Sequence, residues 1–174
     1  MAGFLRSQGA LAAALAAPLA GLLITVVPLP AQAEAFGRWQ QRPRSCTVEH
    51  GGAPALRCQA VQLDQRSPEV LRLSVQAQGP ARGELIQLTL VGALLEGQQP
   101  MGCSNGACTL KKSLQFSLST LSLARFDGRG LAQSIPDTRP VQGLCRIDPA
   151  ALQCEAIAAD QAGAPPWTIK AQLR

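Results

Sequence analysis

Six cysteines are the residues of this chain whose type and spacing could most readily do chemistry. They are Cys46, Cys58, Cys103, Cys108, Cys145 and Cys154. An even number of cysteines in an exported chain is typical of a disulfide framework. Zinc binding is the alternative, but the sequence has no Cys-x-x-Cys and a single histidine, so the usual ligand spacing is missing. We therefore expect structural disulfides, with no metal and no other cofactor.

A pattern with catalytic potential spans residues 102–106, Gly-Cys-Ser-Asn-Gly, which matches the Gly-x-Ser-x-Gly nucleophile elbow. That motif requires a strand-to-helix turn in a large α/β sheet and a histidine further along the chain. Here a strand pattern follows the motif, and the single histidine, His50, lies before it. We therefore expect Ser104 at a hairpin tip rather than in a catalytic site.

Acid–base and redox catalysis are weaker possibilities. Asp127 and Asp137 could form a general acid–base pair, but both lie in turn sequences, where aspartate bonds nearby backbone amides. The Cys103/Cys108 pair could be redox-active, but a hairpin lacks the helix N-terminus that lowers a thiol pKa. His50 stands beside two glycines and is expected to be a loop residue. No catalytic, cofactor-binding or metal residue is predicted.

The elements that must position these residues are strands rather than helices. Apolar and polar residues alternate over 71–76 and 113–119, and again over 167–171 near the C-terminus. Residues 84–95 are apolar on both faces, as in a central strand, and Gly92 there predicts a bulge. Turn signals recur between these runs. The pattern predicts an all-β fold, a single antiparallel β-sandwich or barrel built from hairpins and stabilised by disulfides.

The register of each expected hairpin predicts how the cysteines pair. A turn at Asp148–Ala151 places the two flanking cysteines opposite each other at a non-hydrogen-bonded position, where facing Cα atoms are closest. A type I′ turn at Asn105-Gly106 and a loop over residues 50–54 do the same for the other two hairpins. The predicted pairs are Cys46–Cys58, Cys103–Cys108 and Cys145–Cys154.

The first and last hairpins belong to two similar units, residues 45–78 and 144–174. Each unit combines a disulfide hairpin, a loop and a third strand. Two equivalent binding surfaces would be the functional interpretation of this similarity. An internal duplication, or two hairpins that pack on one core, is the structural interpretation, which we favour because repetition usually reflects packing.

The N-terminal residues 1–33 have the features of a secretory signal peptide. Arg6 is the only charged residue before Glu34, an uncharged run rich in alanine and leucine follows it, and residues 31–33 (Ala-Gln-Ala) offer a cleavage site. An uncleaved anchor is the alternative, because the run is long enough to span a bilayer. Cleavage would leave residues 34–174, about 140 residues, as one β domain without membrane contact, located in the periplasm or secreted.

Several motifs in the first half resemble the invasion-associated locus B family of exported bacterial proteins. They are Phe36-Gly37-Arg38-Trp39, then Cys46 and Cys58, the strand pair 70–76 and 84–95, and the four-residue gap between Cys103 and Cys108. The likeness covers residues 36–110. The family usually has an acid where this chain has Arg38, and the Cys145/Cys154 hairpin has no counterpart in it. The resemblance implies an all-β, exported, non-catalytic protein that acts at the boundary between cell and host.

Charge and composition narrow the class of function. The formal net charge is +5, but the basic residues are scattered and aromatics make up 3% of the chain, so nucleic-acid binding is not expected. We predict an exported, non-enzymatic binding or structural β module whose partner is a protein or a cell-envelope component. The alternative is a small periplasmic enzyme or accessory factor with a cleft between hairpins. Clustering of Asp127, Asp137 and His50 in one pocket would favour that alternative, and their dispersal would favour the module.

Overall fold

The computed structural model describes residues 36–161 and 163–173, which belong to one compact unit. The predicted signal peptide, residues 1–33, lies outside the described residues. The described residues form no helix, and hence none with the length and hydropathy needed to cross a membrane. They form the strands β1 (Gly37–Gln41), β2 (Ser45–His50), β3 (Leu56–Gln65), β4 (Val70–Gln78), β5 (Leu85–Leu94), β6 (Gly102–Ser104), β7 (Ala107–Thr109), β8 (Leu114–Phe126), β9 (Asp137–Ile147), β10 (Ala151–Ala158) and β11 (Trp167–Gln172).

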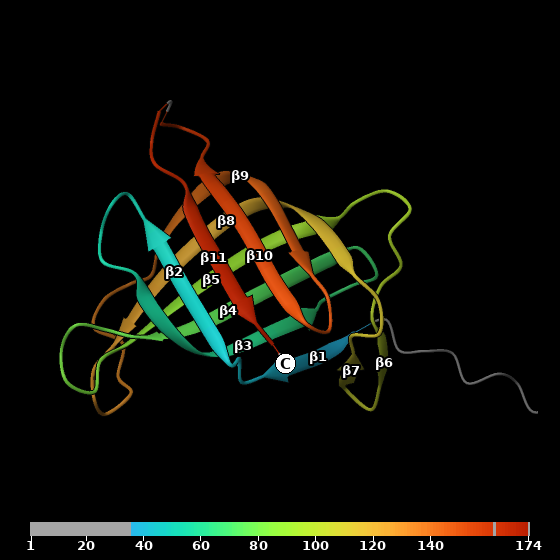
Figure 1. Ribbon diagram of the computed structural model, residues 1–174, viewed down its shortest axis with the longest axis horizontal. Helices are drawn as coiled ribbons and strands as arrows, with labels where there is room; N and C mark the ends of the chain where they lie inside the picture. The colour runs from blue at the N-terminus through green and yellow to red at the C-terminus, as the bar shows by residue number, and fades with distance from the viewer. Residues whose placement is uncertain (1–35, 162, 174) are drawn as a thin grey trace, which may run out of the picture. The chain divides into compact units, whose positions relative to one another are not determined.

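Eight of these strands close into an antiparallel barrel in the order β2-β3-β4-β5-β8-β9-β10-β11 (Figure 1). Each strand pairs with the next one in this order, and β11 returns to β2 from Trp167↔His50 to Gln172↔Ser45. The predicted all-β, antiparallel fold is confirmed, and of the two expected architectures the chain adopts the barrel. Closure gives every barrel strand a neighbour on both sides, which removes exposed sheet edges.

Strand β3 is shared by two partners on one side of the barrel wall. Its first residues pair with β2 through Val48↔Leu56, and its last residues pair with β1 through Trp39↔Leu63. The sequence pattern did not predict β1, whose alternation over five residues is too short to stand out. Strand β2 pairs with β11 over most of its length and with β3 only at the start of β3. The edge of β3 beyond that point pairs with β1, which packs Trp39 against the core.

The β6–β7 hairpin lies beside β1 at one end of the barrel (Figure 1). The buried amide of Gln65 fixes the segment that leads into it. The Met101 N–H donates to Gln65 Oε1 at 2.7 Å, and Gln65 Nε2 donates to the Met101 carbonyl at 3.3 Å. Met101, Cys103, Cys108 and Leu110 are all buried and extend the core at this end.

Aliphatic side chains fill the barrel interior. Leu71, Leu73 and Val75 alternate along β4 and are at most 1% exposed. The β5–β8 register shifts at Gly92, as expected, but the extra residue lies on the partner strand: Val91 faces Thr120 and Gly92 faces Leu118, so Ser119 of β8 is left over. A Cβ at Gly92 would lie 2.0 Å from the Ser117 carbonyl oxygen, so no larger residue fits this close approach of two strands.

The three disulfides join Cys46 to Cys58, Cys103 to Cys108 and Cys145 to Cys154, with Cα–Cα distances of 5.0, 4.0 and 4.1 Å. These are the pairs that the hairpin registers predict, and no cysteine is free. Cys145 faces Cys154 in the β9–β10 ladder, as counted from the turn. Five of the six cysteines are buried, and Cys58 packs against the core, so the bridges belong to the hydrophobic core.

The two similar units have the same local topology. Strands β2, β3 and β4 form one antiparallel meander, and β9, β10 and β11 form the other. The two meanders meet where β11 pairs with β2, which is the seam that closes the barrel. The seam thus joins the first strand of one unit, β2, to the third strand of the other, β11.

A candidate binding pocket at the open end of the barrel

The barrel end opposite the β6–β7 hairpin contains a pocket of about 640 Å³. Apolar residues of β2, β5 and β8, namely Val48, Ile86 and Leu123, line it together with the β2–β3 and β4–β5 loops. Its further lining residues are His50, Ala53, Pro54, Ala55, Leu56, Arg57, Gln78, Gly79, Pro80, Arg125 and Trp167. The volume lies within the range of about 300–1,000 Å³ found for small-molecule sites, and barrel mouths are a common place for them.

Two stacked rings form part of the pocket wall. His50, the last residue of β2, is the cross-strand partner of Trp167, the first residue of β11. Their ring centroids lie 3.9 Å apart and the ring planes differ by 5°. The expectation that His50 is a loop residue was wrong, because pairing with β11 extends β2 to His50 and the turn begins at Gly51. The stack gives the pocket a flat, largely apolar surface.

One ring nitrogen of this stack is held away from water. His50 Nδ1 is buried and has no hydrogen-bond partner among the described residues. A buried polar atom without a partner is unfavourable by about 1–3 kcal/mol. No sequence pattern indicated the contact between His50 and Trp167, since it depends on which strand pairs with β2.

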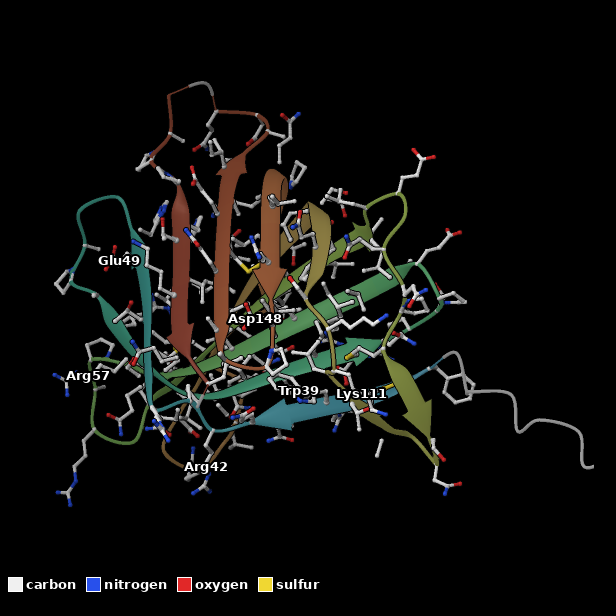
Figure 2. All side chains as sticks on the ribbon, turned by 45° about the vertical axis from the view of Figure 1, so that its right-hand side comes forward. Trp39, Arg42, Glu49, Arg57, Lys111 and Asp148 are labelled. Atoms are coloured by element: carbon white, nitrogen blue, oxygen red, sulfur yellow. A yellow bond between two sulfur atoms is a disulfide. The ribbon has the colours of Figure 1, made fainter. Side chains whose placement is uncertain are left out.

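Two arginines line the pocket, and only one of them forms an ion pair. Arg125 Nη1 donates to Glu84 Oε1 at 3.3 Å, and Glu84 also accepts the Ala81 N–H at 3.1 Å. Glu84 is 7% exposed, so this carboxylate compensates Arg125 and holds the β4–β5 loop in place. Arg57 is exposed and forms no ion pair within residues 36–161 and 163–173. Figure 2 shows it at the left of the barrel, on the same side as Glu49 of β2.

Ser104 lies where the hairpin interpretation expects it. It is exposed at the end of β6, and the next two residues, Asn105 and Gly106, have φ values of 50° and 74°. Positive φ at both turn residues is the signature of the predicted type I′ turn. Strand β7 follows this turn, so the strand-to-helix context of a nucleophile elbow is absent here.

The two candidate acids, Asp127 and Asp137, both bond to residues close to them in the sequence. Asp127 accepts the backbone N–H groups of Arg129 and Leu131, each at 2.9 Å, as the turn interpretation predicts. The hydrogen bond from Leu131 contributes most to a pKa of Asp127 below its usual value, against a smaller rise from burial. Asp137 differs from the expectation, because it begins β9 and pairs with Arg139 rather than lying in a turn.

The pocket brings together only one of the three residues that a catalytic interpretation would need. His50 lines it, but neither Asp127 nor Asp137 does. No group of three or more His, Cys, Asp or Glu side chains in the described part of the chain could hold a metal ion. The residues that the pocket does gather are mostly apolar, which suits binding better than acid–base chemistry.

Comparison of this chain with protein-family models, with curated protein sequences and with solved structures finds no match. The resemblance of residues 36–110 to the invasion-associated locus B family therefore stays a prediction, and the proposed function rests on the pocket.

Proposed function

We propose that this chain is an exported, non-enzymatic binding module whose open barrel end takes a small apolar ligand that carries an anionic group. The observation behind this proposal is the 640 Å³ pocket, whose walls combine aliphatic side chains with the His50–Trp167 stack and a single uncompensated cation, Arg57. Apolar walls favour binding by about 25 cal/mol for each Å² of apolar surface removed from water. A guanidinium at the rim orients a carboxylate or sulfonate.

Three formed disulfides support an oxidising location. We propose the periplasm or the cell exterior, reached through cleavage after Ala33. Intact-mass measurement of protein from an exporting host should give an N-terminus at Glu34 and a mass six protons lower than that of the reduced chain. Recovery of residues 1–33 in the membrane fraction would contradict this.

A matched pair of dyes tests the ligand class. One is 1-anilinonaphthalene-8-sulfonate, and the other is N-phenyl-1-naphthylamine, which has the same rings without the sulfonate. In a Trp39→Phe background Trp167 is the only tryptophan, so energy transfer from Trp167 to the dye reports binding at the pocket. We expect both dyes to bind, the sulfonate more tightly. Because Arg57 is exposed, Arg57→Gln should weaken sulfonate binding by about two- to fivefold and leave the neutral dye unchanged.

The controls separate this pocket from the rest of the surface. Arg146→Gln removes an exposed arginine of β9 outside the pocket and should change neither affinity. Ala55→Phe, which adds no second tryptophan, should obstruct the pocket and weaken binding of both dyes, with the unfolding transition as a check that the variant folds. If neither dye binds, or if Ala55→Phe binds both as well as the parent protein does, the proposal fails.

A further inference from the structure

A second hollow lies on the outer face of the barrel, over β1, β3, β4 and β5, and its lining is polar. Ser74 of β4 and Thr89 of β5 are cross-strand partners on this face, since their neighbours along each strand belong to the core. Both are only 7% exposed although they point away from the interior. The hollow has a volume of about 160 Å³, and we call it the outer groove.

The outer groove carries an excess of positive charge. Arg38, Arg66 and Arg72 line it, and Asp64 is the one acidic residue among the lining residues. Asp64 is 6% exposed and accepts hydrogen bonds from Arg38 Nε at 2.8 Å and Gln62 Nε2 at 2.9 Å. Burial raises the pKa of Asp64, but these bonds and the nearby arginine charges outweigh it and leave the pKa below its usual value. Asp64 is thus ionised, and its single charge offsets one of three guanidinium groups.

Arg66 and Arg72 form no ion pair among the described residues, and of these two only Arg72 is partly buried. Arg72 faces Asp64 across the β3–β4 ladder, but Asp64 accepts its hydrogen bonds from Arg38 and Gln62 instead. Arg72 Nε is buried and has no hydrogen-bond partner among residues 36–161 and 163–173. A buried charged donor without an acceptor is more costly than a neutral one, so this position favours an incoming anion.

The polar neighbours of Arg72 restrict the kind of anion. Gln62, Gln76 and Gln87 present amide groups in the groove, and Ser74 adds a hydroxyl. Amides and hydroxyls both donate and accept hydrogen bonds, which suits hydroxyl groups on a ligand, whereas guanidinium groups suit carboxylate, phosphate or sulfate. The volume is well below the about 300 Å³ at which sites for drug-sized ligands begin, so the groove fits one such group and its immediate substituents.

We propose that the outer groove is an oxyanion site, in which Arg72, assisted by Arg38 and Arg66, binds the carboxylate or phosphate of a hydroxyl-rich molecule such as an acidic sugar. This site is separate from the apolar pocket at the barrel end and shares none of its lining residues. It does not depend on the function proposed for that pocket.

Arginine side-chain NMR provides a direct test. The Arg72 Nε–Hε signal of ¹⁵N-labelled protein is followed during titration with inorganic phosphate, glucuronate or glucose, at constant ionic strength set by chloride because surface charges are screened by salt. We expect saturable shifts with phosphate and glucuronate and none with glucose. Tighter binding of glucuronate than of phosphate would identify a sugar-borne anion as the ligand, and equal binding would identify the oxyanion alone.

Two variants and a control complete the test. Arg72→Gln should weaken binding of either anion about tenfold or more, whereas Arg146→Gln, which removes a strand arginine outside the groove, should leave it unchanged. Asp64→Asn should tighten binding, because it removes the one negative charge of the groove, and it keeps the proposal testable if Arg72→Gln fails to fold. Absence of any Arg72 shift with both anions, or equal affinities in Arg72→Gln and Arg146→Gln, would overturn the proposal.

Discussion

The imidazole of His50 and the indole of Trp167 lie face to face, 3.9 Å apart, at the point where the last strand of the barrel pairs with the first. The contact has two consequences. The stacked rings stabilise one end of the seam between β2 and β11, and they form part of the wall of the apolar pocket. The same pair of residues therefore contributes to the β2–β11 seam and to the pocket wall.

A double-mutant cycle should measure this coupling. His50→Ala and Trp167→Ala each remove one ring, and the interaction free energy from the two single variants and the double variant should be about 0.5–1 kcal/mol in urea unfolding. The same cycle between His50 and Trp39, which lies on β1 and pairs with Leu63 instead, should give a value near zero. Equal coupling energies in the two cycles would show that the stack makes no specific contribution.

Gly143 should be intolerant of any side chain. A Cβ at this position would lie 1.9 Å from the carbonyl oxygen of Glu155 on β10, and φ is 154°. Gly143→Ala should therefore destabilise the fold by about 1–3 kcal/mol, the usual range for overpacking. Gly102→Ala is the control, because its nearest atom would be Thr109 Oγ1 at 3.7 Å. Thermal unfolding of the two variants provides the comparison, and equal melting temperatures would contradict the expected clash.

The ion pair of Asp64 should make part of the stability depend on pH. Its pKa is lower in the folded chain than the value of about 3.9 expected in the unfolded chain. The contribution is thus fully present above pH 4 or so and is lost as the pH falls through the folded pKa. In urea unfolding, the stability gap between the parent protein and Asp64→Asn should be largest at neutral pH and shrink in acid.

A carboxylate of similar chemistry but without buried partners is the control for this pH dependence. Glu49 is exposed on β2, and Glu49→Gln should change the free energy of unfolding by less than about 0.5 kcal/mol at neutral pH. A gap between the parent protein and Asp64→Asn that stays constant from neutral to acid pH would rule out the ionised Asp64 as its source.

Substitutions at the tip of the β6–β7 hairpin should change stability through the backbone conformation that they require. Removal of the Ser104 hydroxyl should have little effect. Gly106 has a φ of 74°, so Gly106→Val should cost about 1–3 kcal/mol, while Gly106→Asn should be tolerated better because asparagine adopts this conformation more readily. Ser104→Ala should change stability by less than about 0.5 kcal/mol. Labelling of the parent protein by a fluorophosphonate probe, lost in Ser104→Ala, would instead support a hydrolase.

The sequence by itself determined the local parts of this structure. Turn chemistry fixed the registers at Asn105-Gly106 and at Asp148–Ala151, where the Asp148 carboxylate accepts the N–H groups of Ala150 and Ala151. Once a turn is fixed, the pairing of cysteines a few residues away follows from counting, because residues face each other in order along a hairpin. The alternating runs are local as well, because successive side chains of a strand point to opposite faces.

The tertiary structure alone decided which distant strands meet. Pairing of β11 with β2 turns a series of hairpins into a barrel, brings His50 onto Trp167 and opens the pocket between the loops at that end. Likewise, the outer groove needs β1 beside β3 and β5 beside β4 before Arg38, Asp64 and Arg72 share one face. Neither contact has a local turn that fixes its register. Each depends on how the twist and the packing of the whole barrel bring its edges together, and no short stretch of sequence contains that information.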